Sequence, residues 1–375
     1  KHDERENARE KLRKAMRLLL VVANLLAIIA LLLVGYSDLL QPESWPKLSN
    51  VGLLMPAVIL ANLVFLVLWI LLRPRLLCLP VAGLLLAFVP IRQYTPFNPT
   101  EEPPHGALKL LSWNVAMFEG HVTKEGEKSE MMRYLLDSDA DFICLQEATD
   151  KGDSLSPLKL LRHKYAYTTF VPKASETGHG LFLASRYPIL SHDSIPYHSP
   201  GNMSVDFLVD VGGQKVCIIN NHLQSYGISE KEREDFHHIL QGDVEADTAR
   251  IETLQLIEKL SKGTTRRAAQ VRMVAARIQQ RLKEGLPVIA CGDLNDTPIS
   301  YTHRTLSKGL TDCYIASGNG PGRSFNRNGI YTRIDHILCS DFFKPYGAKV
   351  DDSIHTSDHY PIFLSLIHIS EPTRR

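Results

Sequence analysis

The chain has 375 residues, of which 44% are hydrophobic, and it holds 42 Lys and Arg against 41 Asp and Glu. This apolar content excludes an intrinsically disordered chain and a small disulfide-rich protein. The balanced charge excludes a chain whose partner is selected by bulk charge. Residues 1–104 have a small excess of basic residues and the rest of the chain has a small excess of acidic ones. The larger part is therefore not a basic nucleic-acid binder in bulk.

Three apolar runs predict a membrane module over residues 1–93. The runs at 15–34 and 51–72 each have the length of about 20 residues that a helix needs to cross the hydrocarbon core. The third run, 76–91, is short and contains two prolines, so we expect two or three transmembrane helices. A signal peptide is the alternative for the first run. Its long apolar part, the lack of a clear cleavage site and the second run that follows disfavour that alternative.

Basic residues beside the runs predict the orientation of the module. They precede the first run and follow the second: Lys11, Arg13, Lys14, Arg17, Arg73 and Arg75. Such residues favour the cytoplasmic side. If the third run crosses, the rest of the chain lies outside the cytoplasm. Five cysteines without obvious pairing weigh against an oxidising compartment. We nevertheless expect an integral protein of the inner or cell membrane with an extracytoplasmic catalytic domain.

The remaining boundaries follow from composition. Four prolines make residues 94–107 a stiff, extended linker, and the soluble domain is expected over 108–366. The last residues, 367–375, read IHISEPTRR and fit no strand or helix pattern. They resemble translated sequencing-adapter sequence, so we expect a non-native tail. The missing initial Met also suggests a fragment.

Short runs rich in Val, Ile and Phe alternate with longer helical stretches, which predicts an α/β domain. Helices are expected at 229–261 and 266–285, and the arginines of the second are interpreted as a solvated face rather than a nucleic-acid site. The predicted strands are Leu108–Val115, Asp141–Leu145, Gly180–Ser185, Val205–Val211, Val216–Asn220, Val288–Cys291, Ile334–Cys339 and Pro361–Leu366.

Polar residues follow several of these strands. In chain order the motifs are WN (113–114), QE (146–147), NHL (221–223), GDLND (292–296), RIDH (333–336) and SDH (357–359). A single Glu or Asn at a strand end is usually a solvated or turn-forming residue. Six such motifs at strand ends instead indicate polar groups gathered on one rim of a sheet, where function commonly resides.

This ordered set resembles the endonuclease/exonuclease/phosphatase superfamily over about residues 108–366. The resemblance implies a four-layer α/β sandwich of two mixed β-sheets flanked by helices, here preceded by two or three transmembrane helices. It also implies Mg²⁺-dependent hydrolysis of a phosphoester, with Mn²⁺ as an alternative ion. GDLND followed by SDHYP is a specific combination.

The chemistry of the residues supports this interpretation. Mg²⁺ prefers hard oxygen ligands, so Glu147 is the best ligand candidate, with Asn114 supporting it through its amide oxygen. Asp293 and Asn295 are two residues apart, so their side chains point the same way in an extended segment. Asp293 is expected to orient or deprotonate the attacking water while Asn295 holds a phosphate oxygen. His359 is expected to donate to the transition state, where charge develops.

The resemblance adds three residues and shows two departures. It implies that Asp358 is a metal-proximal or histidine-orienting carboxylate, that His222 is a general acid for the leaving oxygen, and that Asp335 orients a catalytic histidine. Some nucleases of the family carry an acid where this chain has Ala116, so a second carboxylate ligand is absent there. His222 disfavours a strict apurinic endonuclease.

The substrate is left open among three hypotheses. A membrane-tethered nuclease acting on DNA or RNA is favoured. A hydrolase of lipid or phosphoinositide headgroups is the alternative, and a catalytically silent membrane receptor or scaffold is a third. The neutral domain does not favour tight non-specific binding of nucleic acid, although a local groove could provide it. The expected partners are a phosphoester and the lipid bilayer, with no protein partner evident.

Overall fold

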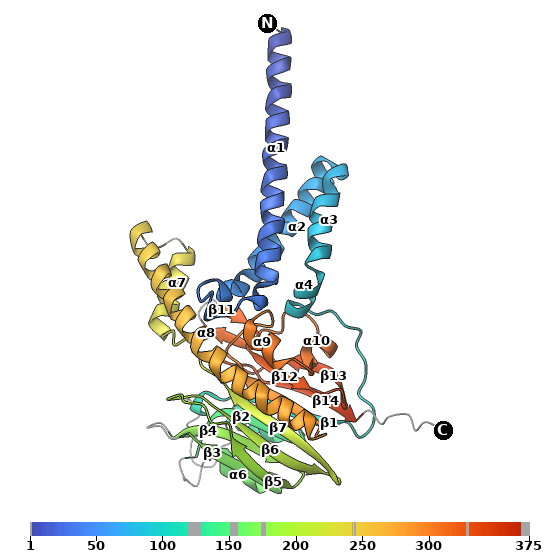
Figure 1. Ribbon diagram of the computed structural model, residues 1–375, viewed down its shortest axis with the longest axis vertical. Coiled ribbons are helices and arrows are strands. Elements are labelled where there is room, and N and C mark those ends of the chain that lie inside the picture. Colours follow the sequence, from blue (N-terminus) through green and yellow to red (C-terminus); the bar gives the residue numbers. More distant parts are fainter. Residues whose placement is uncertain are drawn as a thin grey trace, which may run out of the picture.

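Two β-sheets packed face to face form the larger part of the protein, and a group of apolar helices rises from one end (Figure 1). The structure is a computed structural model that describes residues 2–118, 129–150, 157–173, 178–241, 243, 245–327 and 330–368. Helices flank both outer faces of the sheet pair, so the predicted sandwich of two mixed sheets is confirmed.

The first six-stranded sheet has the order β13-β14-β1-β2-β4-β3. Its strands are β1 (Leu108–Asn114), β2 (Phe142–Thr149), β3 (Tyr167–Pro172), β4 (His179–Ser185), β13 (Phe343–Val350) and β14 (Ile362–His368). Strands β1 and β2 are parallel and the other neighbours are antiparallel. The carboxyl ends of β1 and β2 therefore meet at one edge of the sheet.

The second six-stranded sheet has the order β5-β6-β7-β8-β12-β9. Its strands are β5 (Ile189–Ser194), β6 (Met203–Val211), β7 (Gln214–His222), β8 (Val288–Asp293), β9 (Thr311–Asp312) and β12 (Asp335–Cys339). Here β7 and β8 are the parallel pair. A short hairpin of β10 (Phe325–Arg327) and β11 (Ile330–Thr332) lies outside both sheets.

Three apolar layers hold the sandwich together. Side chains such as Phe142, Ile218 and Ile289 fill the space between the sheets. Helices α5 (Glu130–Asp137) and α6 (Pro157–Lys164) cover the outer face of the first sheet. Helix α8 (Ala246–Lys283) covers the second with the predicted apolar stripe. Its Arg277 and Arg281 bind buried Asp206, so two of the arginines interpreted as solvated have a structural role.

Each predicted strand is present, but the two predicted helices divide differently. Helix α7 (Glu230–Gln241) ends early, and α8 runs without a break through the stretch at 262–265 where we expected a turn. Gly263 lies against Tyr226, whose Cα would be 2.9 Å from an added Cβ. This glycine therefore permits close packing rather than ending a helix. Strands β5 and β13 were not predicted because one is polar and the other contains Pro345 and Gly347.

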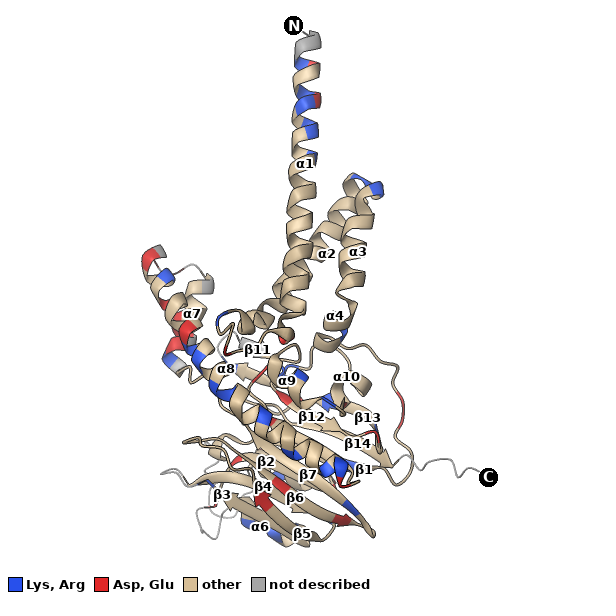
Figure 2. Ribbon diagram, viewed as in Figure 1, with Lys and Arg blue, Asp and Glu red and all other residues tan. Residues whose placement is uncertain are grey.

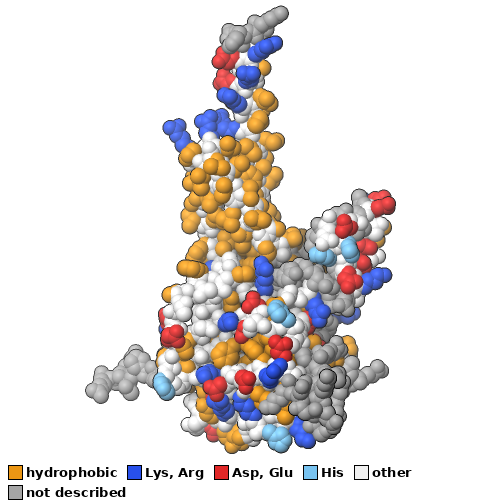
Figure 3. Space-filling view, turned by 180° about the vertical axis from the view of Figure 1, so that it is seen from behind, with side chains coloured by type: hydrophobic (Ala, Val, Ile, Leu, Met, Phe, Trp, Pro, Cys, Tyr) orange, Lys and Arg blue, Asp and Glu red, His pale blue; other side chains and the backbone are white. Residues whose placement is uncertain are grey.

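The anchor consists of α1 (His2–Gly35), α2 (Met55–Leu72), α3 (Cys78–Leu86) and α4 (Phe88–Tyr94), joined by the short helices η1 (Ser37–Leu39), η2 (Leu48–Leu54) and η3 (Pro74–Leu77). Two helical segments, Arg5–Gly35 and Leu48–Leu72, are long and apolar enough to cross a membrane. The pair Pro74–Leu86 and Phe88–Tyr94 adds a third span if the pair, bent by 61°, is counted as one. Figure 3 shows their apolar side chains as a continuous band above the domain.

Polar side chains connect the first two helices of the anchor. Trp69 Nε1 donates to Asn24 Oδ1 at 2.9 Å, and Asn62 Nδ2 donates to the Ala27 carbonyl oxygen at 3.0 Å. Asn24 and Asn62 were the strong polar residues within the first two apolar runs. These hydrogen bonds join α1 to α2 through Asn24, Asn62 and Trp69.

The anchor is in direct contact with the sandwich. Residues 96–104 form neither helix nor strand, and they pack along the domain, where Asn98 Nδ2 donates to the Ile315 and Gly318 carbonyl oxygens. Ile299 is buried among the apolar residues at the base of the anchor. Arg304 and Asp38 form an ion pair of 3.1 Å across the same boundary. The segment predicted to separate anchor from domain therefore lies against the domain.

The C-terminal boundary differs from the expected one by two residues. Ile367 and His368 belong to β14 and pair with Lys344 and Phe343 of β13. The first two residues of the segment expected to be non-native are thus part of the sheet. The remainder of that segment, 369–375, lies outside the described residues.

Candidate active site

The predicted site residues meet where the parallel pairs of both sheets end. Asn114 closes β1, and Glu147 lies near the end of β2 in the first sheet. In the second sheet, His222 closes β7 directly opposite Asp293, the last residue of β8. Because the sheets pack face to face with these ends at one rim, four polar side chains from four strands converge.

Two residues of the site, Glu147 and Asn295, have a left-handed backbone conformation that orients their side chains. Glu147 has a φ of 52° at a register shift between β2 and β4, and Asn295 has a φ of 51° just after β8. Left-handed backbone is costly for a glutamate and persists where surrounding structure enforces it, often at functional sites. Gly292 has a φ of 121°, and a Cβ there would lie 2.1 Å from the Asn221 carbonyl oxygen. The glycine of the GDLND motif is therefore required for the close approach of β7 and β8.

Asn114 joins the two carboxylates of the site. Its Nδ2 donates to Glu147 Oε1 at 3.0 Å and to Asp293 Oδ2 at 3.1 Å. Its Oδ1 accepts from the Ala116 backbone N–H at 3.1 Å. The predicted role, metal support through the amide oxygen, would require this amide to turn over, because the nitrogen faces the carboxylates here.

Asp335 and His359 form a buried pair beside Asp293. His359 Nδ1 lies 2.8 Å from Asp335 Oδ2, and His359 Nε2 lies 3.7 Å from Asp293 Oδ2. The Trp113 indole donates to the His359 carbonyl oxygen, and the Phe325 ring contacts the imidazole edge-to-face. Contacts to both its backbone and its imidazole ring therefore fix His359, and its Nε2 faces the pocket.

Burial and neighbouring charge set the protonation states. Burial disfavours the charged form of His359, but Asp335 and Asp293 outweigh it and raise its pKa to about 10. Burial, together with the charge of Asp335, raises the pKa of Asp293 to about 7. Burial also lowers the pKa of His222, whose Nε2 is 3.4 Å from Glu147 Oε1. The site thus holds a protonated imidazole, a neutral one and an aspartate poised near neutrality.

A pocket of about 660 Å³ opens onto this group. Six of the predicted residues line it: Glu147, His222, Asp293, Asn295, Asp358 and His359. Asn114 and Asp335 lie behind them, where they position other side chains. The Asn295 backbone N–H donates to Asp293 Oδ1 at 2.8 Å, and its Nδ2 donates to the Leu223 carbonyl oxygen at 2.9 Å. The structure therefore brings the whole predicted set together.

Comparison with known proteins identifies the fold of this domain. Residues 111–359 match the Endonuclease/Exonuclease/phosphatase family. The chain belongs to this family. The resemblance predicted from the six motifs is confirmed, as is the prediction of a phosphoric ester hydrolase, since the family comprises metal-dependent phosphoesterases. Residues 17–94 match a domain of unknown function (DUF8431), and no curated protein is significantly similar in sequence.

Several solved structures are similar to the chain. TDP2 from Caenorhabditis elegans is 18% identical, covers 69% of this chain and 74% of its own, and has a TM-score of 0.49. The human Nocturnin catalytic domain with bound sulfate is 18% identical, with 70% and 95% covered and a TM-score of 0.48. An endonuclease/exonuclease/phosphatase family protein from Bacteroides thetaiotaomicron is 18% identical, with 72% and 100% covered and a TM-score of 0.46.

The site includes a histidine that sequence reasoning missed. His179 begins β4, lines the pocket, and has its Nε2 2.9 Å from the Gly201 carbonyl oxygen. It shares the pocket lining with Glu147 and His222. His179 belongs to none of the six motifs, so the motif order gave no reason to single it out.

The oxygen ligands suit the divalent ion that members of this family use. Glu147 and Asp293 present carboxylate oxygens to the same amide, and the raised pKa of Asp293 shows that negative charge there is poorly compensated. A cation beside Glu147 would compensate it, and oxygen ligands fit Mg²⁺ or Mn²⁺. Asp293, Asp335 and His359 also have ligand atoms within 4.8 Å of one another. Asp335 and His359 are hydrogen-bonded to each other, so we interpret this second group as a hydrogen-bonded pair beside Asp293 rather than as a metal site.

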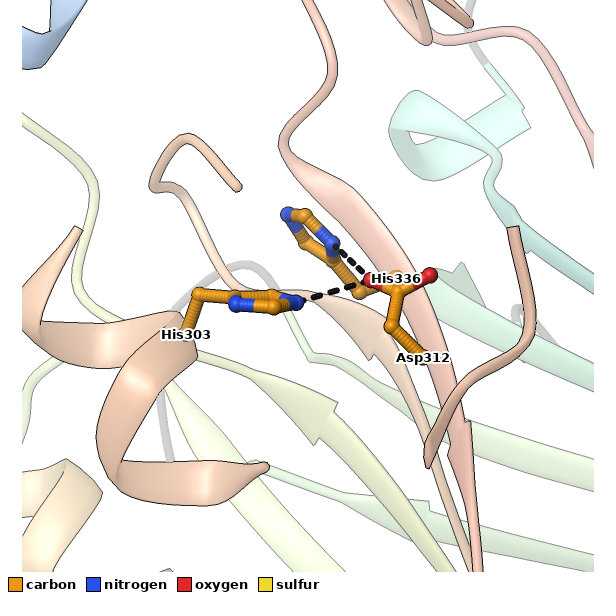
Figure 4. Close-up of side chains that lie close together, drawn as sticks. All are labelled: His303, Asp312 and His336. Atoms are coloured by element: carbon orange, nitrogen blue, oxygen red, sulfur yellow. Dashed lines mark hydrogen bonds and ion pairs between the residues drawn. The ribbon is translucent and has the colours of Figure 1, made fainter. Parts of the chain in front are cut away.

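A separate buried group lies behind the site, between α9 (Tyr301–Leu306) and β12. Figure 4 shows His303 and His336 directed at one carboxylate oxygen of Asp312, at 2.8 and 3.3 Å. The second ring nitrogen of His336, Nε2, lies 3.0 Å from the Asp296 carbonyl oxygen. Despite burial, both histidines hold the pKa of Asp312 well below its usual range. We interpret this group as a structural support for the loop that follows β8.

Proposed function

We propose that the protein is a membrane-anchored, Mg²⁺-dependent phosphodiesterase, with Mn²⁺ as an alternative ion. The observation that carries this proposal is the convergence of Glu147, His222, Asp293 and His359 on one pocket. Two carboxylates and two imidazoles there have different protonation states, as general acid–base chemistry on a phosphoester requires.

Each residue has a role in a direct displacement by water. Asp293 takes a proton from the water as its oxygen bonds to phosphorus, and its carboxylate lies at the pocket between Asn114 and His359. The ester P–O bond breaks, and its electron pair leaves on the alcohol oxygen, which takes a proton from His222. The arriving phosphate raises the low pKa of His222, because a nearby anion favours the imidazolium.

The remaining residues stabilise charge. His359, protonated and oriented by Asp335, donates a hydrogen bond to a phosphate oxygen, and Asn295 offers its second amide proton to another. Glu147 and Asp358, which line the same pocket, would hold the divalent ion. When bound, that ion offsets the negative charge that accumulates on the phosphate.

Turnover of a soluble diester tests this proposal. The full chain in detergent should hydrolyse bis-p-nitrophenyl phosphate with Mg²⁺ and stop in excess EDTA. Asp293→Asn should lose about 10²-fold or more in rate, within the range attributed to a general base. Asp352→Asn, an exposed residue of the same domain, is the matched control and should retain activity. Full turnover in EDTA, or equal losses in both variants, would contradict the proposal.

We infer that the catalytic domain is extracytoplasmic and that the protein belongs to the inner or cell membrane. The support is geometric: α1 ends and α2 begins beside the domain, and the bent pair of α3 and α4 returns to it (Figure 1). Basic residues lie at the opposite end of the anchor, at the start of α1 and at Arg73 and Arg75 (Figure 2). Basic residues favour the cytoplasmic side.

A further inference from the structure

The pocket lies at the end of the sandwich that contacts the anchor. Ile299, four residues after Asn295, is 1% exposed and packs with Leu31 and Met55 at the base of α1 and α2. Arg333, two residues before Asp335, donates from Nη2 to the Gln93 carbonyl oxygen at 2.8 Å. Two segments that supply site residues are thus fixed directly against the membrane helices.

One wall of the pocket is made by the anchor itself. Leu53, in η2, lines the same pocket as Asp293 and His359. It lies two residues before Met55, where α2 begins, within a segment apolar enough to cross the bilayer. This wall of the pocket therefore lies beside the start of α2, where the candidate membrane span meets the domain.

Other apolar side chains continue this wall. Leu260 of α8, Ile228, Phe325 and Ile334 also line the pocket. Helix α8 is joined to η2 by a hydrogen bond of 2.6 Å from Thr264 Oγ1 to Asn50 Oδ1, which keeps the two sides of the opening together. The pocket thus has polar side chains such as Asp293 and His359 on one side and apolar side chains such as Leu53 and Leu260 on the other.

The charge of the described lining residues favours one class of substrate over another. Among the described residues that line the pocket, none is Lys or Arg. Proteins that bind nucleic acid neutralise several backbone phosphates with such residues. A lining with histidines, amides and apolar groups suits a single phosphate next to a hydrocarbon, as in ligand pockets with few polar groups in an apolar setting.

We propose that the substrate is a phosphodiester lipid of the bilayer that enters the pocket from the membrane surface. Its phosphate lies at Asp293 and His359, and its hydrocarbon lies against Leu53 and Leu260. This rests on the proposed function and uses the same step: water adds across one P–O bond, and an alcohol and a phosphomonoester are released. This proposal prefers the lipid alternative to the nucleic-acid substrate, and the test below distinguishes the two.

The test compares Leu53→Asp with Leu48→Asp in the full chain reconstituted into vesicles. Both leucines belong to η2, and Leu48 is exposed outside the described pocket lining. The vesicles contain phosphatidylethanolamine, phosphatidylglycerol and sphingomyelin, and mass spectrometry follows the lipid products. Parallel reactions use bis-p-nitrophenyl phosphate, plasmid DNA and RNA, all with Mg²⁺.

We expect the unmodified chain to hydrolyse at least one of the three lipids. Leu53→Asp should lose about tenfold or more of lipid turnover, because a buried charge faces the hydrocarbon. It should lose more of the lipid turnover than of the soluble-diester turnover, and Leu48→Asp, outside the described pocket lining, should keep both. Cleavage of the soluble diester without any lipid hydrolysis, or equal losses of lipid turnover in the two variants, would overturn the lipid proposal alone. Cleavage of DNA or RNA with no lipid hydrolysis would assign the nuclease function instead. Failure on every substrate would overturn the proposed function as well.

Discussion

His359 Nδ1 lies 2.8 Å from Asp335 Oδ2, and this contact determines which nitrogen of the imidazole faces the pocket. The second nitrogen, Nε2, is left 3.7 Å from Asp293. Asp335 is 1% exposed and comes from β12, whereas His359 precedes β14 in the other sheet. A positioning carboxylate from one sheet thus holds a catalytic imidazole from the other.

Asp335→Asn should lower turnover by about 10²-fold or more, because a neutral amide no longer fixes the imidazolium. It should also change the pH profile. Asp335 and Asp293 hold the pKa of His359 at about 10, so the imidazolium persists until pH rises through that value. Without Asp335, the alkaline limb of the rate profile should move to lower pH. Asp341→Asn, at an exposed position after β12, is the control. An unmoved alkaline limb would assign Asp335 a purely structural role.

Metal binding should be measurable without activity. Mg²⁺ or Mn²⁺ should raise the melting temperature of the unmodified chain, because a ligand that binds only the folded state stabilises it by mass action. Glu147→Gln removes the best oxygen ligand and should abolish most of this shift. Glu284→Gln, on the exposed end of α8, should leave the shift intact. An equal shift in all three proteins would show that the ion binds elsewhere.

Much of the fold and site followed from the sequence because both depend on local pattern. The strands from Val205 to Asn220 are apolar enough to be recognised singly, and parallel strands bring their carboxyl ends together. The motifs at the strand ends predicted that such polar residues share one rim, and the structure has His222 directly opposite Asp293. The ordered motifs then identified partners from distant parts of the chain, such as Asp335 and His359.

Other features depend on contacts that no local pattern records. The docking of Ile299 into the anchor and the place of Leu53 in the pocket arise from tertiary packing between segments far apart in sequence. The burial of His359 is one example: it is 4% exposed, and its removal would leave Asp335 without its imidazole partner. His359→Ala is therefore expected to destabilise the domain as well as to lower activity, since an unpaired buried carboxylate is destabilising.

Asp312→Asn should destabilise the domain while leaving the catalytic side chains in place. The substitution removes a buried charge that accepts from His303 and His336, and breaking such a pair costs about 3–5 kcal/mol. The N-cap contact to Ile315 can survive, since Asn also caps helices. Chemical unfolding of the full chain measures the difference in free energy.

The pH dependence of that difference has a definite sign. The pKa of Asp312 is lowered in the folded state, so its contribution is complete above the unfolded value of about 4. It is lost as pH falls through the lower folded value. The difference in free energy of unfolding between the unmodified chain and Asp312→Asn should therefore be largest near neutral pH and decrease below about pH 4. A gap that widens with acid would contradict this account.

Cysteine labelling can determine which side of the membrane holds the catalytic domain. Cys78 is exposed and lies three residues beyond Arg75, at the end of the anchor away from the sandwich, whereas the domain cysteines are buried. Asp352→Cys would add an exposed thiol to the domain. With three crossings and basic residues inside, a membrane-impermeant maleimide added to spheroplasts should label position 352 at once and Cys78 only after permeabilisation. Labelling of position 352 is measured in a chain that also carries Cys78→Ser, so that the thiol of Cys78 does not contribute to the signal. Labelling of both positions only after permeabilisation would show that the bent pair of α3 and α4 does not cross, and that the domain is cytoplasmic. The reverse order of labelling would show that the anchor is inserted with the opposite orientation.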